Sequence, residues 1–306
     1  MNVPEISIII RTLNEALHLS SLLSAIKNQK CKFSHEVVLI DSGSTDKTLE
    51  IAKKFNCRIT HIKKKDFSFG RSLNKGIDFS NGKYLVFISG HCVPKNEKWL
   101  ENLVMPIADE KVQLTYGKQL AGRDSYCSER QIYKKYFPEE SKIPQKGFFC
   151  NNANSALLSD IWRKYLFDED LTGLEDMDLA QRLVKDGGRV GYISNAPVYH
   201  IHNESWPQVR RRFEREAIAL RKISPSLLIR KRDVIRYIYS AIINDIFPKK
   251  GNKKPKLRQI PSIFLYRFNQ YIGSYNGNHY KKELTSEFKE IYFYPRIDSE
   301  DVGKLR

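Results

Sequence analysis

The stretch EVVLIDSGSTDKTLEIA, residues 36–52, carries the pattern on which the fold depends. It begins with a run of β-branched and aliphatic residues, passes through a polar turn at Asp41, and continues with apolar residues at helical spacing. Ser44 stands where a helix N-cap is expected. A strand followed by a polar turn and a helix is typical of a parallel α/β sheet, because parallel strands need a crossover connection.

The same alternation continues on both sides of this stretch. Strands are predicted at 5–10 (EISIII), 57–62 (CRITHI) and 83–88 (KYLVFI), and helices at 17–29 and 70–80. Continuous apolar strands indicate a sheet that is covered by helices on both faces. We therefore expect an α/β fold with a mainly parallel sheet, whose ligands bind at the carboxyl ends of its strands.

Composition limits the class of protein. With 306 residues and a hydrophobic fraction of 41%, the chain can bury one large core or two modest ones. Its five cysteines are scattered and lack C-x-x-C spacing, which indicates a reducing compartment rather than a disulfide framework or zinc cluster. We find neither a signal-peptide pattern nor an apolar run of roughly 20 residues, so a cytoplasmic protein without a spanning helix is expected.

Positive charge is concentrated late in the chain. The net charge is +17, and residues 210–258 carry sixteen Lys and Arg residues against four acidic ones. Aromatic and aliphatic residues interleave with these cations, as in basic amphipathic helices that lie on anionic headgroups. A solvated basic face above a core stripe accounts for the pattern equally well. The charge alone would also suit a nucleic-acid binder.

Two common phosphate-binding motifs are missing. Neither G-x-G-x-x-G nor G-x-x-x-x-G-K-[ST] occurs after the predicted strands. Asp41 instead ends a buried strand, where its carboxylate can accept a base imide N–H or a ribose hydroxyl. Capping of the next helix by Asp41 and Ser44 is an equally good interpretation.

Four segments together resemble family 2 glycosyltransferases of the GT-A fold. They are SIIIRTLNEALHL (7–19), residues 36–52, DFSFGRSLNKGIDFSNGKYLVFI (66–88), and the long stretch from FFCNNANSALL to VYHIH (148–202). The resemblance covers about residues 5–205. The segment DFSFGRSLN and the basic C-terminal extension are most similar to bacterial rhamnosyltransferase-like enzymes of polysaccharide assembly.

The resemblance implies a nucleotide site. It would be formed by Arg11, Thr12, Asn14, Glu15, Asp41, Arg71, Asn74, Ser89 and His91. Many relatives have an arginine directly before the asparagine, whereas this chain has Leu73 there. Arg71 is the nearest guanidinium and is suited to a phosphate, although it also fits a helix-surface charge.

The family's metal-binding motif is altered. The segment FISGHCVP, residues 87–94, falls where relatives have Asp-x-Asp and a proline, so Ser89 and His91 replace both carboxylates. Mg²⁺ prefers oxygen ligands. Three alternatives stay open: metal-free catalysis with His91 and Arg71 supporting the nucleotide, a softer ion such as Mn²⁺ held by His91 with His200 or His202, or an inactive binding scaffold. A cytidine monophosphate sugar, which needs a metal less, is a further donor hypothesis.

The element LTGLEDMDLAQRL, residues 171–183, supplies the catalytic candidates. Glu175 and Asp176 stand at the start of an amphipathic helix, where acids also interact favourably with the helix dipole. The resemblance implies that Asp176 is the general base and that Glu175 orients the acceptor. It also assigns Asn151, Asn152 and Asn154 to the acceptor and sugar pocket, although asparagines are common in turns for backbone reasons.

These observations lead to one functional prediction. We expect an inverting glycosyltransferase that moves a sugar from a nucleotide-activated donor to a glycan or lipid-linked acceptor in bacterial surface polysaccharide biosynthesis. Residues 1–205 would form the GT-A domain, with a nucleotide-binding half at about 1–95 and an acceptor and catalytic half at 96–205. Residues 206–306 would form a basic, mainly helical region at the inner face of the membrane. A nucleotidyltransferase, a silent nucleotide-sugar binder and a basic nucleic-acid or anionic-surface binder are the alternatives, and we expect no nucleic-acid partner.

Overall fold

A computed structural model describes residues 3–202, 204–248, 254–281 and 292–293. The chain divides into two compact units. The first comprises Met1–Arg123, Ile132–Asp170 and Glu175–His202, and the second comprises Asp124–Gln131, Leu171–Leu174 and Asn203–Arg306. Two short segments that precede residue 205 in the sequence therefore belong to the second unit.

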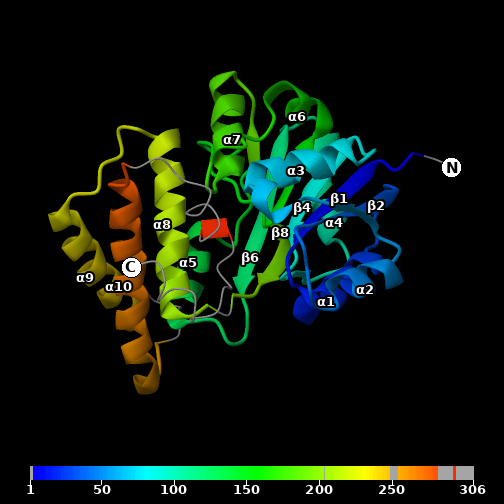
Figure 1. Cartoon of the computed structure of the whole chain (residues 1–306). Helices are drawn as coiled ribbons and strands as arrows, with labels where there is room; N and C mark the ends of the chain where they lie inside the picture. Colours follow the sequence, from blue (N-terminus) through cyan, green and yellow to red (C-terminus); the bar gives the residue numbers. More distant parts are fainter. Residues whose placement is uncertain (1–2, 203, 249–253, 282–291, 294–306) are drawn as a thin grey trace. The chain divides into compact units, whose positions relative to one another are not determined.

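One eight-stranded sheet organises the first unit (Figure 1). Its strands are β1 (Ile6–Thr12), β2 (His35–Asp41), β3 (Arg58–His61), β4 (Tyr84–Ser89), β5 (Cys92–Pro94), β6 (Leu114–Ala121), β7 (Asn154–Leu158) and β8 (Val190–His200), in the order β3-β2-β1-β4-β7-β6-β8-β5. The first four strands are parallel, whereas β7 runs antiparallel to both β4 and β6. The predicted parallel α/β pattern is confirmed.

Helices cover both faces of this sheet. Helices α1 (Ala16–Lys27), α2 (Thr48–Lys54) and α4 (Trp99–Ala108) share one apolar cluster with Ile6, Ile8 and Ile10 of β1. Helices α3 (Phe69–Asp78), α6 (Ser159–Tyr165) and α7 (Glu175–Lys185) share the other with Ile9. Alternate residues of a strand point to opposite faces, so the continuous apolar run of β1 fills both clusters.

Helix α2 begins later than the sequence predicts. Its first residue is Thr48, and Lys47 occupies the N-cap position. The Ser44 hydroxyl instead donates to the Asp41 carboxylate within the preceding loop. The prediction of Ser44 as N-cap is therefore wrong, because a nearby carboxylate takes up the hydroxyl that would have capped the helix.

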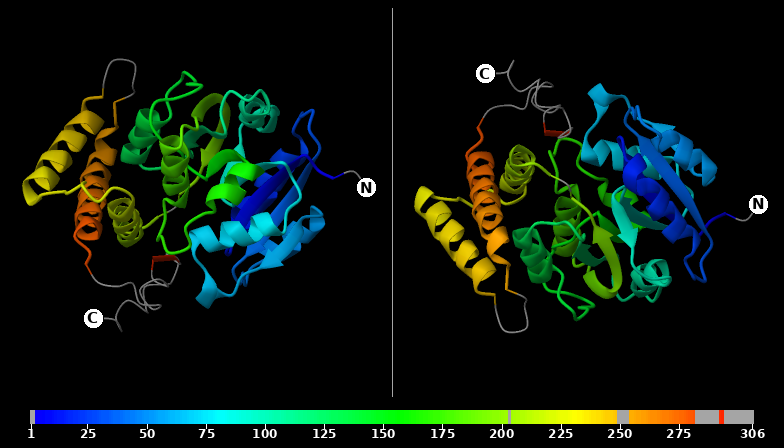
Figure 2. Two further views of the ribbon diagram at one scale, coloured as in Figure 1. Left: turned by 90° about the horizontal axis from the view of Figure 1, so that it is seen from above. Right: turned by 90° about the horizontal axis from the view of Figure 1, so that it is seen from below.

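Long helices dominate the second unit (Figure 2). They are α8 (Trp206–Ile223), α9 (Lys231–Ile246) and α10 (Ile260–Asn278), with η2 (Leu257–Gln259) before α10. Helix α5 (Cys127–Tyr136) begins in this unit and ends in the first, and η1 (Lys64–Asp66) precedes α3. Among the predicted cations, Lys249, Lys250 and Lys253 lie outside the described residues.

Close packing and a buried ion pair connect these helices. A Cβ atom at Gly277 would lie 2.1 Å from the carbonyl oxygen of Glu214, so only glycine permits this approach of α10 to α8. Arg267 of α10 holds Asp245 of α9 through two contacts, Nε–Oδ2 at 2.8 Å and Nη2–Oδ1 at 2.7 Å. The Ser128 hydroxyl also donates to this carboxylate at 2.6 Å. No helix in the described ranges is long and apolar enough to cross a bilayer.

Candidate active site

The carboxyl ends of β1, β2 and β4 meet at one edge of the sheet. The strand register pairs Thr12 with Asp41 and Arg11 with Ser89. Parallel strands place these ends together, so the polar residues that follow them in sequence gather in one region. The structure thus brings together the strand ends at which the sequence predicts a ligand to bind.

Asp176 lies buried in the first turn of α7. Its side chain accepts two backbone hydrogen bonds, from Asn152 N–H to Oδ2 at 2.7 Å and from Met177 N–H to Oδ1 at 2.7 Å, and the residue is only 7% exposed. Burial, followed by the negative charge of Glu175, raises the pKa of the Asp176 carboxyl to about 7. The two backbone hydrogen bonds and Arg11 act in the opposite direction. A carboxyl group with this pKa can gain and lose a proton near neutral pH.

Glu175 is paired with Arg11 at the end of β1. The Arg11 Nη1 lies 3.3 Å from Glu175 Oε1 and also donates to the Phe69 carbonyl at 3.3 Å. The guanidinium stacks over the Phe69 ring at 4.7 Å. Arg11 was predicted to bind the nucleotide, but in the structure it balances the charge of the acidic pair.

The Asp41 carboxylate closes its own loop. Its Oδ2 accepts from the backbone N–H groups of Gly43 and Ser44, at 2.9 and 3.0 Å. Gly43 has φ +101°, a left-handed conformation that glycine adopts without strain. Asp41 therefore stabilises the loop after β2 and does not cap α2, whose N-cap is Lys47, and Asp41 also lines the hollow described next.

A hollow of about 410 Å³ lies beside this loop, with Asp41, His61, Lys63, Arg71 and Lys75 in its wall. Lys63, Arg71 and Lys75 outnumber Asp41 and Asp66 in this wall, which favours an anionic ligand such as a phosphate. Arg71 Nε pairs with Glu169 at 2.7 Å, and both side chains are more than a third exposed. Exposed pairs contribute little stability, so an incoming phosphate can compete for this guanidinium.

Thr12 and Asn14 join the β1 loop to the β2 loop. The Thr12 hydroxyl lies 3.3 Å from Asp41 Oδ1, and Asn14 Oδ1 accepts from the Thr45 backbone N–H at 2.8 Å. Asn14 adopts φ 55°, which asparagine tolerates better than most residues. Both residues shape the loops at the ligand edge.

Two predicted ligand residues are occupied within the protein. Asn74 accepts from the Trp162 indole at 2.9 Å and donates to the Phe167 carbonyl at 2.9 Å. Asn154, which is fully buried, accepts from the Trp99 indole at 2.8 Å and donates to backbone carbonyls of β6 and β8. Their amides hold neighbouring elements together, so neither is part of the site that we propose.

Asn152 is better placed for a ligand. Its backbone bonds Asp176, its Oδ1 accepts from the Ser155 hydroxyl at 2.8 Å, and its buried Nδ2 lacks a hydrogen-bond partner within the described part of the chain. A buried donor without a partner is costly, and a ligand oxygen would satisfy it. Asn151, by contrast, accepts from the Gln119 amide at 3.0 Å.

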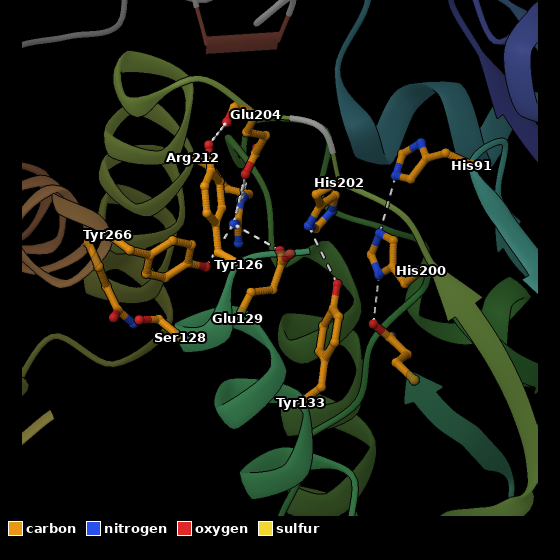
Figure 3. A network of polar contacts seen from close by, with 12 residues as sticks. His91, Tyr126, Ser128, Glu129, Tyr133, His200, His202, Glu204, Arg212 and Tyr266 are labelled. Atoms are coloured by element: carbon orange, nitrogen blue, oxygen red, sulfur yellow. Dashed lines mark hydrogen bonds and ion pairs between the residues drawn. The ribbon is translucent and has the colours of Figure 1, made fainter. Parts of the chain in front are cut away.

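Three histidines, His91, His200 and His202, lie close together in the first unit (Figure 3). His91 follows β4, His200 ends β8, and His202 comes just after that strand. His91 Nε2 lies 3.1 Å from His200 Nε2, and the rings of His200 and His202 are 4.2 Å apart. One nitrogen from each ring falls within 4.8 Å of the others.

Each histidine also contacts a polar group behind it. Glu15 Oε1 lies 3.1 Å from His91 Nδ1, and Gln119 Oε1 lies 2.7 Å from His200 Nδ1. The Tyr133 hydroxyl is 3.4 Å from His202 Nδ1. The sequence did not point to Gln119 or Tyr133, because nothing in their local patterns distinguishes them from other polar residues of a strand and a helix.

The ligand atoms that the three histidines offer determine which metal ion fits. The ring nitrogens of the three histidines are ligands that first-row transition ions accept readily, whereas Mg²⁺ prefers oxygen. The segment Ser89-Gly90-His91 offers a hydroxyl and an imidazole, and no carboxylate that would suit a harder ion. The residues present thus fit a divalent transition ion and do not fit Mg²⁺.

Comparison with known proteins gives a consistent family. The model of "Glycosyl transferase family 2" matches residues 7–166, just over half of the 306-residue chain. The chain is 27% identical over 213 residues to the O-antigen chain rhamnosyltransferase RfbN of Salmonella typhimurium, covering 65% of this chain and 67% of the relative. It is 26% identical over 181 residues to the O-antigen chain rhamnosyltransferase WbaN of Salmonella anatum, covering 55% and 57%.

A solved structure shares the fold. The mannosyltransferase PcManGT from Pyrobaculum calidifontis, in complex with GDP-Man and Mn²⁺, superposes with a TM-score of 0.57 at 17% identity. The superposition covers 89% of this chain and 70% of that protein. At this identity the likeness concerns the GT-A fold alone.

Proposed function

The chain belongs to glycosyl transferase family 2, and from this premise we propose that it is an inverting enzyme in which Asp176 is the general base. The observation that carries the proposal is the buried Asp176 carboxyl, whose pKa is raised to about 7. A base is most effective when its pKa lies near the working pH. As a glycosyltransferase, the protein needs one such group to activate the acceptor hydroxyl.

The proposed reaction is a single displacement. Asp176 takes the proton of the acceptor hydroxyl while that oxygen forms a bond to the anomeric carbon of the donor sugar. The bond from the anomeric carbon to the phosphate oxygen breaks on the opposite face, and the nucleotide leaves with the electron pair. Attack opposite to the leaving group inverts the anomeric configuration. Glu175, balanced by Arg11, would orient the acceptor.

The donor would occupy the hollow beside Asp41. Base and ribose would contact the Asp41 loop, and the phosphates would lie towards Lys63, Arg71 and Lys75. Asn152 Nδ2 would donate to a hydroxyl of the sugar or the acceptor. With these assignments the nucleotide and the general base Asp176 would lie at the same edge of the sheet, which a displacement reaction requires.

His91, His200 and His202 would hold a divalent transition ion at this edge. Such an ion would neutralise the charge that develops on the departing phosphates. If the ion is not used, the imidazoles and Arg71 would support the nucleotide by hydrogen bonds and charge. We favour the first arrangement because the three ring nitrogens converge.

The acceptor would be a glycan or a lipid-linked intermediate of bacterial surface polysaccharide. The names of the two O-antigen chain rhamnosyltransferase relatives support this assignment. We propose that the enzyme works in the cytoplasm, as a peripheral protein at the inner face of the cell membrane. The basic residues between 210 and 258 support attraction to anionic lipid.

One face of α9 is the part of the second unit that we assign to the membrane. Ile235, Tyr239, Ile243 and Phe247 are spaced by four residues and are 72%, 71%, 39% and 64% exposed. This apolar stripe follows one side of the helix, and Phe247 continues it at the C-cap. A stripe of this kind would enter the boundary between headgroups and acyl chains.

Charge decides between a membrane and a second copy of the chain. Lys231, Arg232 and Arg236 are exposed along or beside the stripe. Of the acids on α9, Asp233 pairs with Arg236 at 3.5 Å and Asp245 is buried against Arg267. Two copies would bring like charges together, whereas an anionic lipid surface is complementary.

Donor screening tests the proposed function. The purified chain is incubated with UDP-, dTDP-, GDP- and CMP-sugars and a polyprenyl-linked acceptor, and the released nucleotide and glycosylated lipid are measured together. We expect one donor to give both products in equal amounts and Asp176→Asn to give neither while still binding that nucleotide. Binding without turnover in the unmodified protein would instead identify a silent nucleotide-sugar binder.

A further inference from the structure

We infer that His91, His200 and His202 form a metal site that selects zinc-like ions over Mg²⁺, with Gln119 and Glu15 positioning the ring nitrogens. This inference goes beyond the proposed function because it names the class of ion and the residues that orient its ligands. Only the catalytic role of the ion rests on the proposed function. The three rings and both positioning residues belong to the first unit.

A backbone amide fixes the tautomer of His200. The Ala153 N–H donates to Asn151 Oδ1 at 3.0 Å, so this atom is the oxygen of the Asn151 amide. The same oxygen accepts from Gln119 Nε2 at 3.0 Å, which turns Gln119 Oε1 towards His200. Because an amide oxygen can only accept, His200 Nδ1, at 2.7 Å from it, carries the hydrogen. A neutral His200 therefore presents a lone pair at Nε2.

Glu15 has the same effect on His91. Its Oε1 lies 3.1 Å from His91 Nδ1, and an ionised carboxylate can only accept. The hydrogen of a neutral His91 consequently sits on Nδ1, and its Nε2 presents a lone pair. Carboxylates and carbonyl groups behind imidazole ligands are typical of metal sites, where they fix the tautomer and the ring orientation.

The two prepared nitrogens face each other. His91 Nε2 and His200 Nε2 are 3.1 Å apart, and two lone pairs at this distance repel unless a cation lies between them. For comparison, two nitrogens that bind one tetrahedral Zn²⁺ at about 2.0–2.1 Å are separated by about 3.3 Å. A proton shared between the rings is the competing explanation, and the experiment below separates the two.

His202 completes a set of three nitrogen ligands. Its ring centroid lies 4.2 Å from that of His200 and 5.6 Å from that of His91. Figure 3 shows the three rings gathered in one place. Imidazole ligands favour ions late in the first transition row, so affinity should rise from Mn²⁺ to Co²⁺ and Zn²⁺. Mg²⁺ dehydrates reluctantly and prefers oxygen, so a site of three imidazoles should exclude it.

The test uses the full chain after removal of metals with EDTA and dialysis. Co²⁺ is titrated while the visible absorption bands of the ion are recorded, and Zn²⁺, Mn²⁺ and Mg²⁺ are titrated by calorimetry. We expect one equivalent of Co²⁺ with intense bands, affinity for Zn²⁺ at least roughly tenfold above that for Mn²⁺, and no heat with Mg²⁺. No Co²⁺ bands, or equal affinity for Mg²⁺ and Zn²⁺, would overturn the inference and favour the shared proton.

Variants separate ligation from positioning. His202→Ala should abolish the intense Co²⁺ bands, whereas His279→Ala, an exposed histidine of the second unit, should leave them unchanged. Gln119→Leu keeps all three ligands but removes the acceptor behind His200, and it should weaken Zn²⁺ binding about 10- to 100-fold. Gln119→Glu, which keeps an acceptor, should restore most of the affinity. Unchanged affinity in Gln119→Leu would contradict the positioning role.

The result is independent of the proposed enzyme activity. Nucleotide binding by the same preparation is measured in EDTA, before any metal is added. If nucleotide binds there but Co²⁺ gives no bands, the metal inference fails and the glycosyltransferase proposal stands. If Co²⁺ binds as expected but donor screening gives no product, the proposed function fails and the metal site stands.

Discussion

Arg11 Nη1 lies 3.3 Å from Glu175 Oε1, although 164 residues separate the two in the sequence. The contact joins the end of the first strand to the first turn of the helix that carries Asp176. Arg11 lowers the pKa of the Asp176 carboxyl, against the stronger effects of burial and Glu175. The end of β1 therefore has a direct influence on the pKa of the proposed general base.

Replacement of Arg11 by an uncharged residue should shift the pH at which the reaction loses activity. In Arg11→Met the pKa of Asp176 should rise further, because a favourable charge next to its ionised form is removed. The acid limb of kcat/KM should shift to higher pH, with a loss at pH 7 of about fivefold for the first unit of pKa and about tenfold for each further unit. Arg11→Lys should shift it less. Arg58→Met, which removes a cation paired with Glu36, is the matched control and should leave the limb in place.

The unmodified enzyme should also show the titration of Asp176 directly. A general base acts in its deprotonated form, so kcat/KM should rise with pH through about 7 and then level off. Asp176→Asn should lower kcat by about 10²- to 10⁴-fold and leave nucleotide affinity unchanged. Rates measured from pH 5 to 9, at limiting acceptor for kcat/KM and at saturating acceptor for kcat, check both points. A flat profile across this range would contradict the assignment of the base.

The first four strands and their helices were predictable because their signals are local. Apolar runs such as EISIII and helical spacing such as that of residues 48–54 depend on near neighbours only. Ser44 shows the limit of this reasoning. It has the right residue type for an N-cap, but a tertiary loop conformation gives its hydroxyl to Asp41.

The candidate site was predictable in part. The acidic pair and the three histidines were found from their sequence context, whereas the contact of Arg11 with Glu175 depends on how distant segments fold together. Asn74 and Asn154 have residue types that suit sugar hydroxyls, yet their amides bond indole and backbone groups. A single residue type does not reveal whether its polar atoms are already satisfied.

The buried ion pair of the second unit should be important for stability. Asp245→Ala leaves the Arg267 guanidinium buried without its partner, and the free energy of unfolding should fall by about 3–5 kcal/mol. Asp233→Ala removes the exposed pair with Arg236 and the cap that Asp233 makes to the Arg230 N–H, and should cost about 1–2 kcal/mol. Urea denaturation followed by circular dichroism measures both. Equal losses in the two variants would show that burial does not decide the effect.

Membrane binding should depend on the apolar stripe of α9. The double variant Ile235→Ser, Tyr239→Ser should bind more weakly to vesicles of phosphatidylglycerol and phosphatidylcholine. In the unmodified chain both apolar side chains would move from water into the bilayer surface, and this contribution to binding is lost. A fully buried side chain of this size contributes about 1.5–3 kcal/mol, so a loss of roughly tenfold or more for the pair is expected even when burial is partial. Co-sedimentation with the vesicles provides the measurement.

Two controls make this last test specific. Leu17→Ser changes an 80% exposed leucine on α1 of the first unit and should leave vesicle binding unchanged. Binding of the unmodified chain should weaken as salt is raised and disappear on vesicles of phosphatidylcholine alone, since the flanking cations need anionic headgroups. A dimer in solution that the α9 double variant converts to a monomer would show instead that this face binds a second copy, and the membrane assignment would be wrong.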